Sequence, residues 1–395
     1  MRLPSETLRA AYAATPAAAA AAGLMALAVA MGIGRFAFTP VLPMMQDDAG
    51  VSVAQGGWLA AANYAGYFLG ALWAMAQPAR ARCAIRASLL AVGLSTLGMG
   101  LTQDFAAWLV LRAAAGVASA WTLIHVSAWT LERLAPLASP ALNAVVFSGV
   151  GWGIVVAGGL CLALSGIGAG STHAWISLGV LSLAVAALVW PLLGVDPPGR
   201  EPPGASGRGY SWSADGLRLV LCYGAFGFGY IVPATFLPLM AKQAIQDAAI
   251  FGWAWPVFGL TAAASTLLVA ALVRALGNRR VWIGAAMAMA IGVAAPGTLP
   301  GLGAVLLAAI LVGSTFMVIT MVAMQEAKRV AGRDAAVAIG AMSSAFAAGQ
   351  IAGPLAVSSL VGAQGDFSQA LLFAAALLAL SALALAVKSK GREHR

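Results

Sequence analysis

Charged side chains are scarce in this chain of 395 residues: Asp, Glu, Lys and Arg make up 9% of it, whereas apolar residues make up 61%. A water-soluble domain carries about 25% charged residues, so this composition cannot cover a surface that faces water. The long apolar stretches have the length of membrane-spanning helices, about 20 residues. A membrane β-barrel is disfavoured, because the stretches are continuous and do not alternate with a period of two.

Cysteine and histidine are also scarce, with three of each. Cys83, Cys161 and Cys222 are scattered and odd in number, which argues against a disulfide framework or a metal site. The sequence lacks His-Glu-x-x-His, Gly-x-Ser-x-Gly and Gly-x-x-x-x-Gly-Lys-Ser/Thr motifs. We therefore expect no enzyme activity, no cofactor, no bound metal and no ATP-driven transport by this chain.

Apolar stretches that could cross a bilayer number twelve. Their approximate ranges are 18–44, 55–76, 85–102, 105–128, 141–166, 174–193, 216–240, 249–273, 281–300, 302–325, 336–362 and 368–387. They predict an all-α membrane protein with twelve transmembrane helices. The longest joint, 194–215, is rich in Pro and Gly and reads as an irregular linker. It divides the chain into an N-terminal six-helix bundle at 1–193 and a C-terminal six-helix bundle at 216–395.

The two halves repeat each other at a constant separation of 195 residues. The repeated positions are Gly32, Gly34, Leu42, Pro43, Met45, Gly57 and Trp58, which recur as Gly227, Gly229, Leu237, Pro238, Met240, Gly252 and Trp253. A constant separation in a strongly apolar chain predicts a duplicated, parallel, pseudo-two-fold transporter with its substrate site where the halves meet. Stripes of small residues predict close helix packing that lets the halves rock: Ala62, Gly66, Gly70, Ala74; Gly149, Gly153, Ala157; Ala345, Gly349, Gly353.

The net charge of +9 sets membrane orientation and does not indicate a nucleic-acid partner. Nineteen of the 22 Lys and Arg residues fall at the termini or in alternate joints, on one predicted side. Lys242 falls on the other side. This positive-inside pattern predicts that both termini are cytoplasmic. The Ala-, Gly- and Arg-rich composition suggests a bacterial source, so we expect a multi-pass protein of the cytoplasmic (inner) membrane that acts as a monomer.

Several motifs carry a resemblance to a known family. Arg112-Ala-Ala-Ala-Gly116 looks like an Arg-x-x-x-Gly motif, and the stretches 274–280 and 349–354 look like a basic loop and a Gly-Pro element. With 32–43, 227–238 and 313–317, they make the chain resemble the YbfB/YjiJ-like branch of the major facilitator superfamily. The resemblance implies secondary active transport of a small molecule by alternating access, with proton coupling. The superfamily's acidic residue is missing from the loop at 70–86, so its usual charge relay is in doubt there.

Arg35 and Arg112 are the basic residues expected within the membrane. Arg35 precedes Asp47 by twelve residues and Arg112 follows Asp104 by eight, which places them about 18 Å and about 12 Å deep at 1.5 Å per helical residue. An arginine at such depth must face the protein interior or a water-filled cavity. No acidic residue is expected beside them, so a substrate carboxylate or phosphate is the hypothesised counter-charge. The alternative for both residues is a structural role.

Other polar residues are candidates for the same cavity. Tyr230 is the repeat partner of Arg35, and this Arg/Tyr pair suits a substrate with an anionic end and an apolar or aromatic end. Asn63 and Tyr67 share a helix face at i and i+4, and Gln350 is a polar point of the eleventh span. His125 is a candidate proton relay because the pKa of histidine lies near neutrality. For Asn63, Tyr67, Gln350 and His125 the alternative is structural, mostly helix–helix hydrogen bonding.

Two other functions stay open at this point. One is proton-driven efflux of hydrophobic or toxic compounds, although the scarcity of mid-membrane acids disfavours cationic ones. The other is a non-transporting membrane sensor, which the short joints disfavour.

Overall fold

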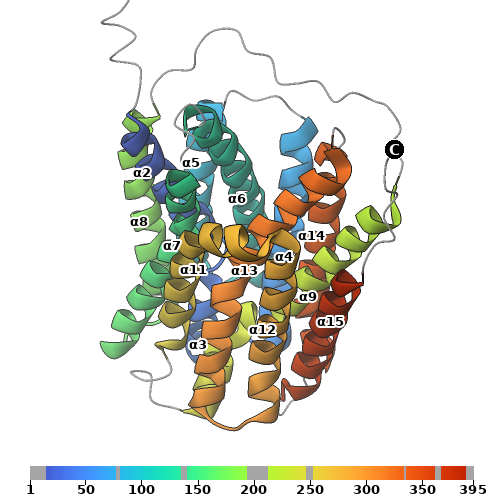
Figure 1. Cartoon of the computed structure of the whole chain (residues 1–395). Helices are drawn as coiled ribbons and strands as arrows, with labels where there is room; N and C mark the ends of the chain where they lie inside the picture. Colours follow the sequence, from blue (N-terminus) through green and yellow to red (C-terminus); the bar gives the residue numbers. More distant parts are fainter. Residues whose placement is uncertain are drawn as a thin grey trace, which may run out of the picture.

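The computed structural model describes residues 15–76, 81–134, 140–193, 212–245, 252–332, 335–360 and 366–387, and within them all regular structure is helical. Twelve rods run up and down the molecule (Figure 1). The first rod consists of α2 (Pro16–Leu27), the π-helix η1 (Ala28–Ile33) and α3 (Phe38–Asp48). The other rods of the first half are α4 (Val53–Ala76), α5 (Ala81–Leu101), α6 (Phe105–Leu134), α7 (Pro140–Gly166) and α8 (Ser171–Leu192).

The second half repeats this order with α9 (Ala214–Ala244), α11 (Ala254–Leu276), α12 (Asn278–Thr298), α13 (Leu302–Ala331), α14 (Ala335–Leu360) and α15 (Ser368–Ala386). The twelve-helix prediction is therefore confirmed. Ten of the rods are long and apolar enough to cross a membrane, and α4 and α14 are not among them. These two carry Asn63 and Gln350 among many Gly, Ala and Ser residues, and they pack against each other across the halves. The half boundaries, 1–193 and 216–395, stay a prediction, and residues 194–211 lie outside the described part.

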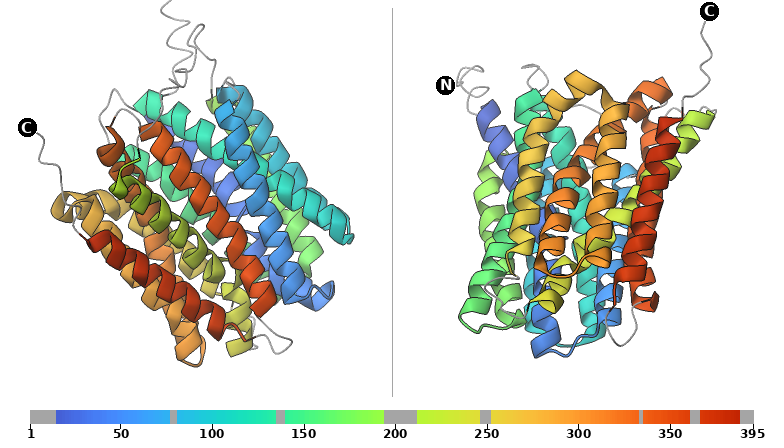
Figure 2. Two further views of the ribbon diagram at one scale, coloured as in Figure 1. Left: turned by 90° about the vertical axis from the view of Figure 1, so that its right-hand side faces the viewer. Right: turned by 60° about the horizontal axis from the view of Figure 1, so that its bottom comes forward.

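Helix α2 begins and helix α15 ends at the same end of the bundle, which we call the terminal end; the opposite one is the far end (Figure 2). Across the halves, α7 packs on α11, α4 on α14 and α3 on α9. Three side-chain contacts between α3 or its preceding turn and α9 join residues 195 apart: Arg35 with Tyr230, Thr39 with Ala234, and Asp47 with Lys242. Because equivalent residues touch each other there, the pseudo-two-fold axis passes between these two helices.

The small-residue stripes hold helices together inside each half, so the prediction that they form the rocking seam was wrong. A Cβ on Gly66 would lie 2.1 Å from the Ala113 carbonyl oxygen, and one on Gly153 would lie 2.2 Å from that of Ala28. Gly349 likewise approaches the backbone of Gly224. Close approaches between the halves fall instead where α7 crosses α11, at Gly151 and Gly259, and where Gly57 of α4 meets Pro354 and Ser358 of α14. Helical spacing revealed small faces but could not say which neighbour each one meets.

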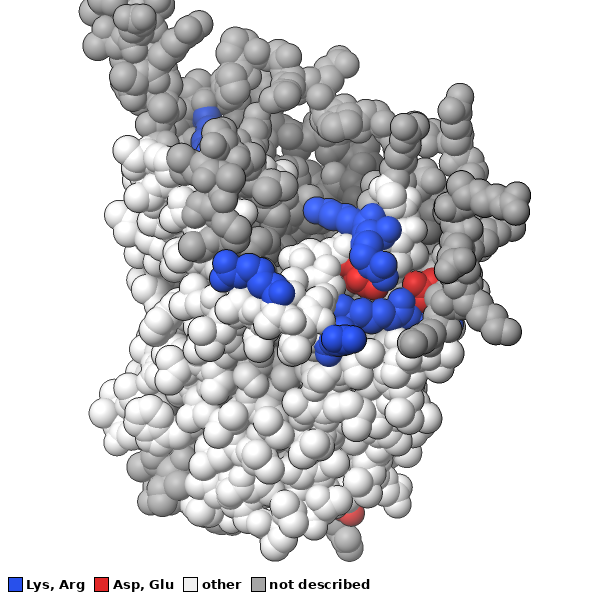
Figure 3. All heavy atoms as spheres, in the orientation of Figure 1, with Lys and Arg blue, Asp and Glu red and all other residues white. Residues whose placement is uncertain are grey.

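Charged residues on the face drawn in Figure 3 gather in its upper part, above a broad band almost free of Lys, Arg, Asp and Glu. At the terminal end, Arg279 binds both carboxylate oxygens of Asp215, at 2.8 and 2.9 Å. Glu326, 1% exposed, pairs with Arg329 at 2.6 Å and with Arg279 at 3.7 Å. This network ties the terminal ends of α9, α12 and α13 together. A band almost free of charged residues and helices of transmembrane length are typical of a multi-pass membrane protein.

Candidate functional site

The first rod is broken at mid-depth, whereas its repeat partner α9 runs unbroken. In η1 the Gly34 and Phe36 amides donate to the carbonyls five residues back, Val29 and Met31, at 2.8 and 3.0 Å. Residues 34–37 then form a turn before α3 begins. The break lies against α7, where a Cβ on Gly32 would sit 2.4 Å from the Gly153 Cα. Such π-turns are frequent at functional sites.

Arg112 of α6 binds the backbone around this break. Its guanidinium donates to the carbonyls of Gly34 and Arg35, each at 3.3 Å, and of Leu59 at 3.5 Å. Asn63 of α4 donates to the carbonyls of Gly34 at 3.3 Å and Arg112 at 2.9 Å. Irregular backbone at membrane depth persists only where buried groups satisfy it. This geometry supports the structural alternative for Arg112 and Asn63.

Arg35 lies in the turn itself and is 2% exposed. Its Cζ lies over three aromatic rings, at 4.3 Å from the Tyr67 centroid, 5.1 Å from Tyr64 and 5.3 Å from Phe36. One guanidinium nitrogen donates to the Tyr230 hydroxyl at 3.5 Å, and Nε has no hydrogen-bond partner. Within the described residues Arg35 forms no ion pair. It is a buried cation that aromatic faces surround.

Tyr230 of α9 receives a second hydrogen bond, 2.5 Å from the amide nitrogen of Gln350. Its ring is nearly parallel to those of Phe316 and Phe346, at interplanar angles of 2° and 8° and centroid distances of 5.7 Å. Gln350 is fully buried, and its amide oxygen has no partner. Arg35, Tyr230 and Gln350 thus form a polar chain across the two halves, with aromatic rings on the side of the second half.

The predicted site residues fall into three places. Four of them come together: Arg35, Tyr67, Tyr230 and Gln350. Arg112 and Asn63 lie beside this group, where their side chains bind backbone carbonyls of the turn. His125 is separate: it lies thirteen residues beyond Arg112 along α6, about 20 Å away at 1.5 Å per residue. Its Nδ1 is 2.8 Å from the Trp121 carbonyl oxygen. A carbonyl only accepts, so Nδ1 carries the proton and Nε2 stays free to bind another.

Sequence reasoning missed four aromatic residues of this site: Phe36, Tyr64, Phe316 and Phe346. Phe36 and Phe316 lie inside the motifs that carry the family resemblance, and Tyr64 follows Asn63 directly. An aromatic residue in an apolar helix carries no signal of which helix it faces. Only the packing of α4, α13 and α14 around the axis brings these rings to Arg35 and Tyr230.

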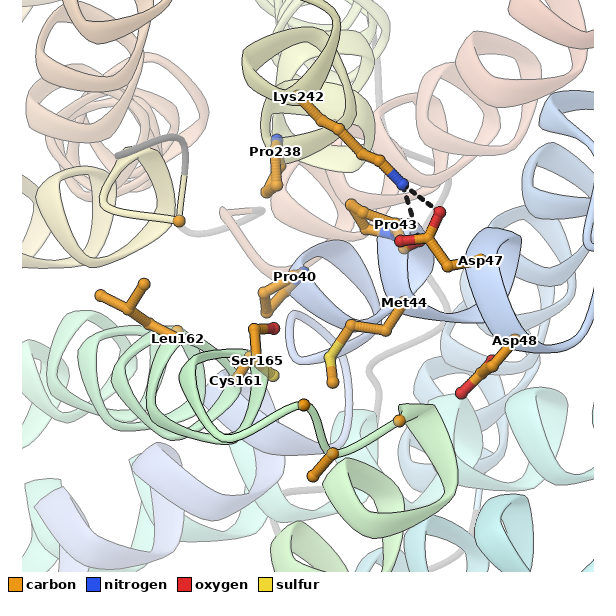
Figure 4. A pocket seen from close by; sticks show the side chains of 15 residues that line it. Pro40, Pro43, Met44, Asp47, Asp48, Cys161, Leu162, Ser165, Pro238 and Lys242 are labelled. Carbon is orange, nitrogen blue, oxygen red and sulfur yellow. Dashed lines mark hydrogen bonds and ion pairs between the residues drawn. The ribbon is translucent and has the colours of Figure 1, made fainter. Parts of the chain in front are cut away.

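Between the site and the far end, hydrogen bonds and one ion pair join the two halves. Lys242 pairs with Asp47 and donates to the Pro43 carbonyl at 3.4 Å, while Thr39 donates to that of Ala234 at 2.8 Å. Tyr64 and Thr235 share a hydrogen bond of 3.1 Å. A pocket of about 360 Å³ opens beside this ion pair, between α3, α7 and α9 (Figure 4). The site residues themselves are buried beneath these contacts.

Two six-helix halves about a pseudo-two-fold axis, with polar side chains from both halves meeting at mid-depth, define the class of secondary transporters of the major facilitator fold. The chain belongs more specifically to the family described as "Uncharacterised MFS-type transporter YbfB", whose model matches residues 27–386. The predicted family is thereby confirmed.

A solved structure of a mutant of the nucleoside transporter NupG superposes with a TM-score of 0.73, covering 92% of this chain and 98% of that one. The two sequences are 14% identical, so this likeness supports the fold alone. No curated protein sequence matches the chain.

Proposed function

We propose that this transporter moves a small organic anion across the bacterial cytoplasmic membrane by alternating access, with both termini in the cytoplasm. The observation that carries the proposal is Arg35, 2% exposed and without an ion pair in the described part of the chain. A buried charge is costly unless a group of opposite sign accompanies it. A substrate carboxylate or phosphate would supply that group, since the arginine fork binds either one with two parallel hydrogen bonds.

The second half gives the proposed substrate its other end. Tyr230, Phe316 and Phe346 offer aromatic surface, and Tyr230 and Gln350 offer polar atoms beside Arg35. An anion with an apolar or aromatic body fits this combination. Binding would bridge the halves, because Arg35 belongs to the first and Tyr230 and Gln350 to the second.

We assign Arg112 and Asn63 a positioning role. Both bind the carbonyls of the turn that holds Arg35, so they would fix its guanidinium without touching the substrate. Arg112 remains a substrate ligand only if its backbone bonds are exchanged during transport.

Proton coupling is part of the proposal through the family resemblance, and His125 is the residue we assign to it. With Nδ1 on the Trp121 carbonyl, Nε2 is the ring nitrogen left to exchange a proton with another group. The orientation rests on the basic residues at the terminal end, which the positive-inside pattern places in the cytoplasm.

The test is counterflow in proteoliposomes with labelled benzoate, lactate and glycerol 3-phosphate, with and without a pH gradient. Benzamide is the neutral match for benzoate, and ethidium represents the hydrophobic cations of an efflux transporter. We expect saturable counterflow of an anion, no counterflow of benzamide, and loss of transport in Arg35→Met but not in Arg280→Met, which removes an exposed arginine.

Transport of ethidium in place of every anion would favour efflux and overturn the proposal. Anion counterflow that survives in Arg35→Met would remove Arg35 from the site. Absence of any flux, in protein that folds, would favour the sensor alternative.

A further inference from the structure

The aromatic residues around Arg35 have a place in the transport cycle that substrate binding alone does not explain. Resting on the function proposed above, we propose that Tyr67, with Tyr64 and Phe36, acts as a substitute counter-charge for Arg35 in the unloaded transporter. We call these three residues the aromatic cage. It lets the transporter bury Arg35 without an anion, and so return empty between its two facing states.

The geometry supports this role. The guanidinium carbon lies 4.3 Å from the Tyr67 ring centroid, 5.1 Å from Tyr64 and 5.3 Å from Phe36. All three distances are within the range of about 6 Å at which the negative face of an aromatic ring attracts a cation. The attraction strengthens when water is excluded, and Arg35 is 2% exposed.

The cage suits the unloaded state because all of its residues belong to the same half as Arg35. Tyr64 and Tyr67 belong to α4, and Phe36 shares the turn of Arg35, so the whole cage belongs to the first half. Tyr230 and Gln350 belong to the second half and separate from Arg35 whenever the halves move apart. The cage instead travels with the arginine. It is therefore available in the state facing either side, and in the closed state between them.

This role has a consequence for transport. A carrier that buries an uncompensated arginine cannot pass through its closed state, so it exchanges one anion for another but moves none in net. A carrier whose arginine is compensated can also return empty. The cage should therefore set the ratio of net transport to exchange, while substrate affinity depends on Arg35 and the second half.

The first experiment needs no substrate. The three native cysteines are replaced by alanine, and spin-label pairs are placed at Ser52 and Ser359 near the far end, and at Ala128 and Lys328 near the terminal end. All four positions are exposed. In unloaded protein, one population should show the spin-label distances expected from this structure, and others the distances of open states. Tyr67→Leu should lower the first population about 5- to 30-fold relative to the open states. Tyr67→Phe, which keeps the ring face, should leave it unchanged.

A double-mutant cycle separates electrostatics from packing. In the Arg35→Met background the cation over the Tyr67 ring is gone, so Tyr67→Leu should have no further effect on the distances. An equal shift with and without Arg35 would show that Tyr67 only packs, and would overturn the inference. So would a shift in Tyr67→Phe as large as that in Tyr67→Leu.

The second experiment reads transport itself with labelled benzoate. Tyr67→Leu should slow net efflux at least about fivefold more than it slows exchange against internal benzoate. Equal losses of both would contradict the inference. If no anion is carried, the proposed function fails, but the spin-label cycle on unloaded protein still decides whether the cage compensates Arg35.

Discussion

The first rod and α9 are copies of one helix, and they meet at the axis through equivalent residues, yet they differ in two respects. The first is interrupted by η1 and a turn, whereas α9 is continuous. The first carries Arg35 where α9 carries Tyr230. The interrupted copy exposes carbonyls that Arg112 and Asn63 satisfy, and the continuous copy needs no such partners.

The residues around the two copies differ as well. Gly116 lies against the Asn63 carbonyl, and Gly313 lies against that of Phe258, which is 195 residues beyond Asn63. This match puts Ala309 at the place of Arg112. The first half therefore carries Arg35 and Arg112 near the axis, where the second half carries Tyr230 and Ala309. Duplication conserved the packing and let the chemistry diverge.

Arg112→Met should have the largest effect, because it removes three hydrogen bonds from carbonyls, two in the broken rod (Gly34 and Arg35) and one in α4 (Leu59). We expect a loss of about 3–5 kcal/mol in unfolding free energy, measured by denaturation in detergent. Arg280→Met is the matched control and should change stability by less than about 0.5 kcal/mol. Similar stability of the two variants would mean that the broken copy does not depend on its partners.

Gly32→Ala and Gly227→Ala test whether the packing is common to both halves. The added Cβ would lie 2.4 Å from the Gly153 Cα in one case and 2.3 Å from the Phe346 carbonyl oxygen in the other. Each should lower unfolding free energy by about 1–3 kcal/mol, because neither neighbour is a flexible side chain. Tolerance of one substitution and not the other would limit the shared scaffold to one half.

Tyr230→Phe sharpens the contrast between polar and aromatic copies. It keeps the ring between Phe316 and Phe346 but removes the hydroxyl that bonds Arg35 and Gln350. We expect a loss of about 1 kcal/mol in unfolding free energy and weaker anion counterflow. Adding Phe316→Tyr to the Tyr230→Phe variant puts a hydroxyl on a neighbouring ring and should not restore transport. Unchanged stability and flux would show that the polar chain across the halves is not used.

The smallest effect should come from the pair at the far end. Asp47→Asn removes an ion pair whose carboxylate side chain is 66% exposed, and such pairs contribute about 0.2–1 kcal/mol. Because Asp47 and Lys242 are equivalent residues across the axis, the exchanged pair Asp47→Lys with Lys242→Asp should restore the parent stability. Failure of the exchange, in a folded protein, would mean that the two positions are not interchangeable.

Much of the fold could be predicted because its signals are local. Twelve apolar stretches, alternating basic joints and a repeat of 195 residues gave the helices and the two halves before any packing was known. Prediction failed where the role of a residue depended on which helix it packs against. The small-residue stripes were found, but their partners were wrong, and the break at residues 28–37 had no local signature beyond Gly32 and Gly34.

The candidate site shows the same division. Arg35 and Tyr230 could be chosen from depth and repeat position, Tyr67 from the helix face that it shares with Asn63, and Gln350 as a polar point of its span. The structure brings all four together. Arg112 stood out for the same reason as Arg35, since charge at depth is visible in sequence. Whether its guanidinium faced a cavity or a carbonyl was not visible, because that depends on where another helix breaks.

By itself, the sequence determined that this protein lies in a membrane, that it has twelve helices in two related halves, and that two arginines lie at depth. Composition, period and repeat fix these features, because the bilayer imposes helix length and burial on each segment separately. Only the tertiary structure decided that one arginine holds a broken backbone, while the other lies among aromatic rings and forms no ion pair with any described residue. That choice depends on contacts between helices far apart in the chain, which no single segment encodes.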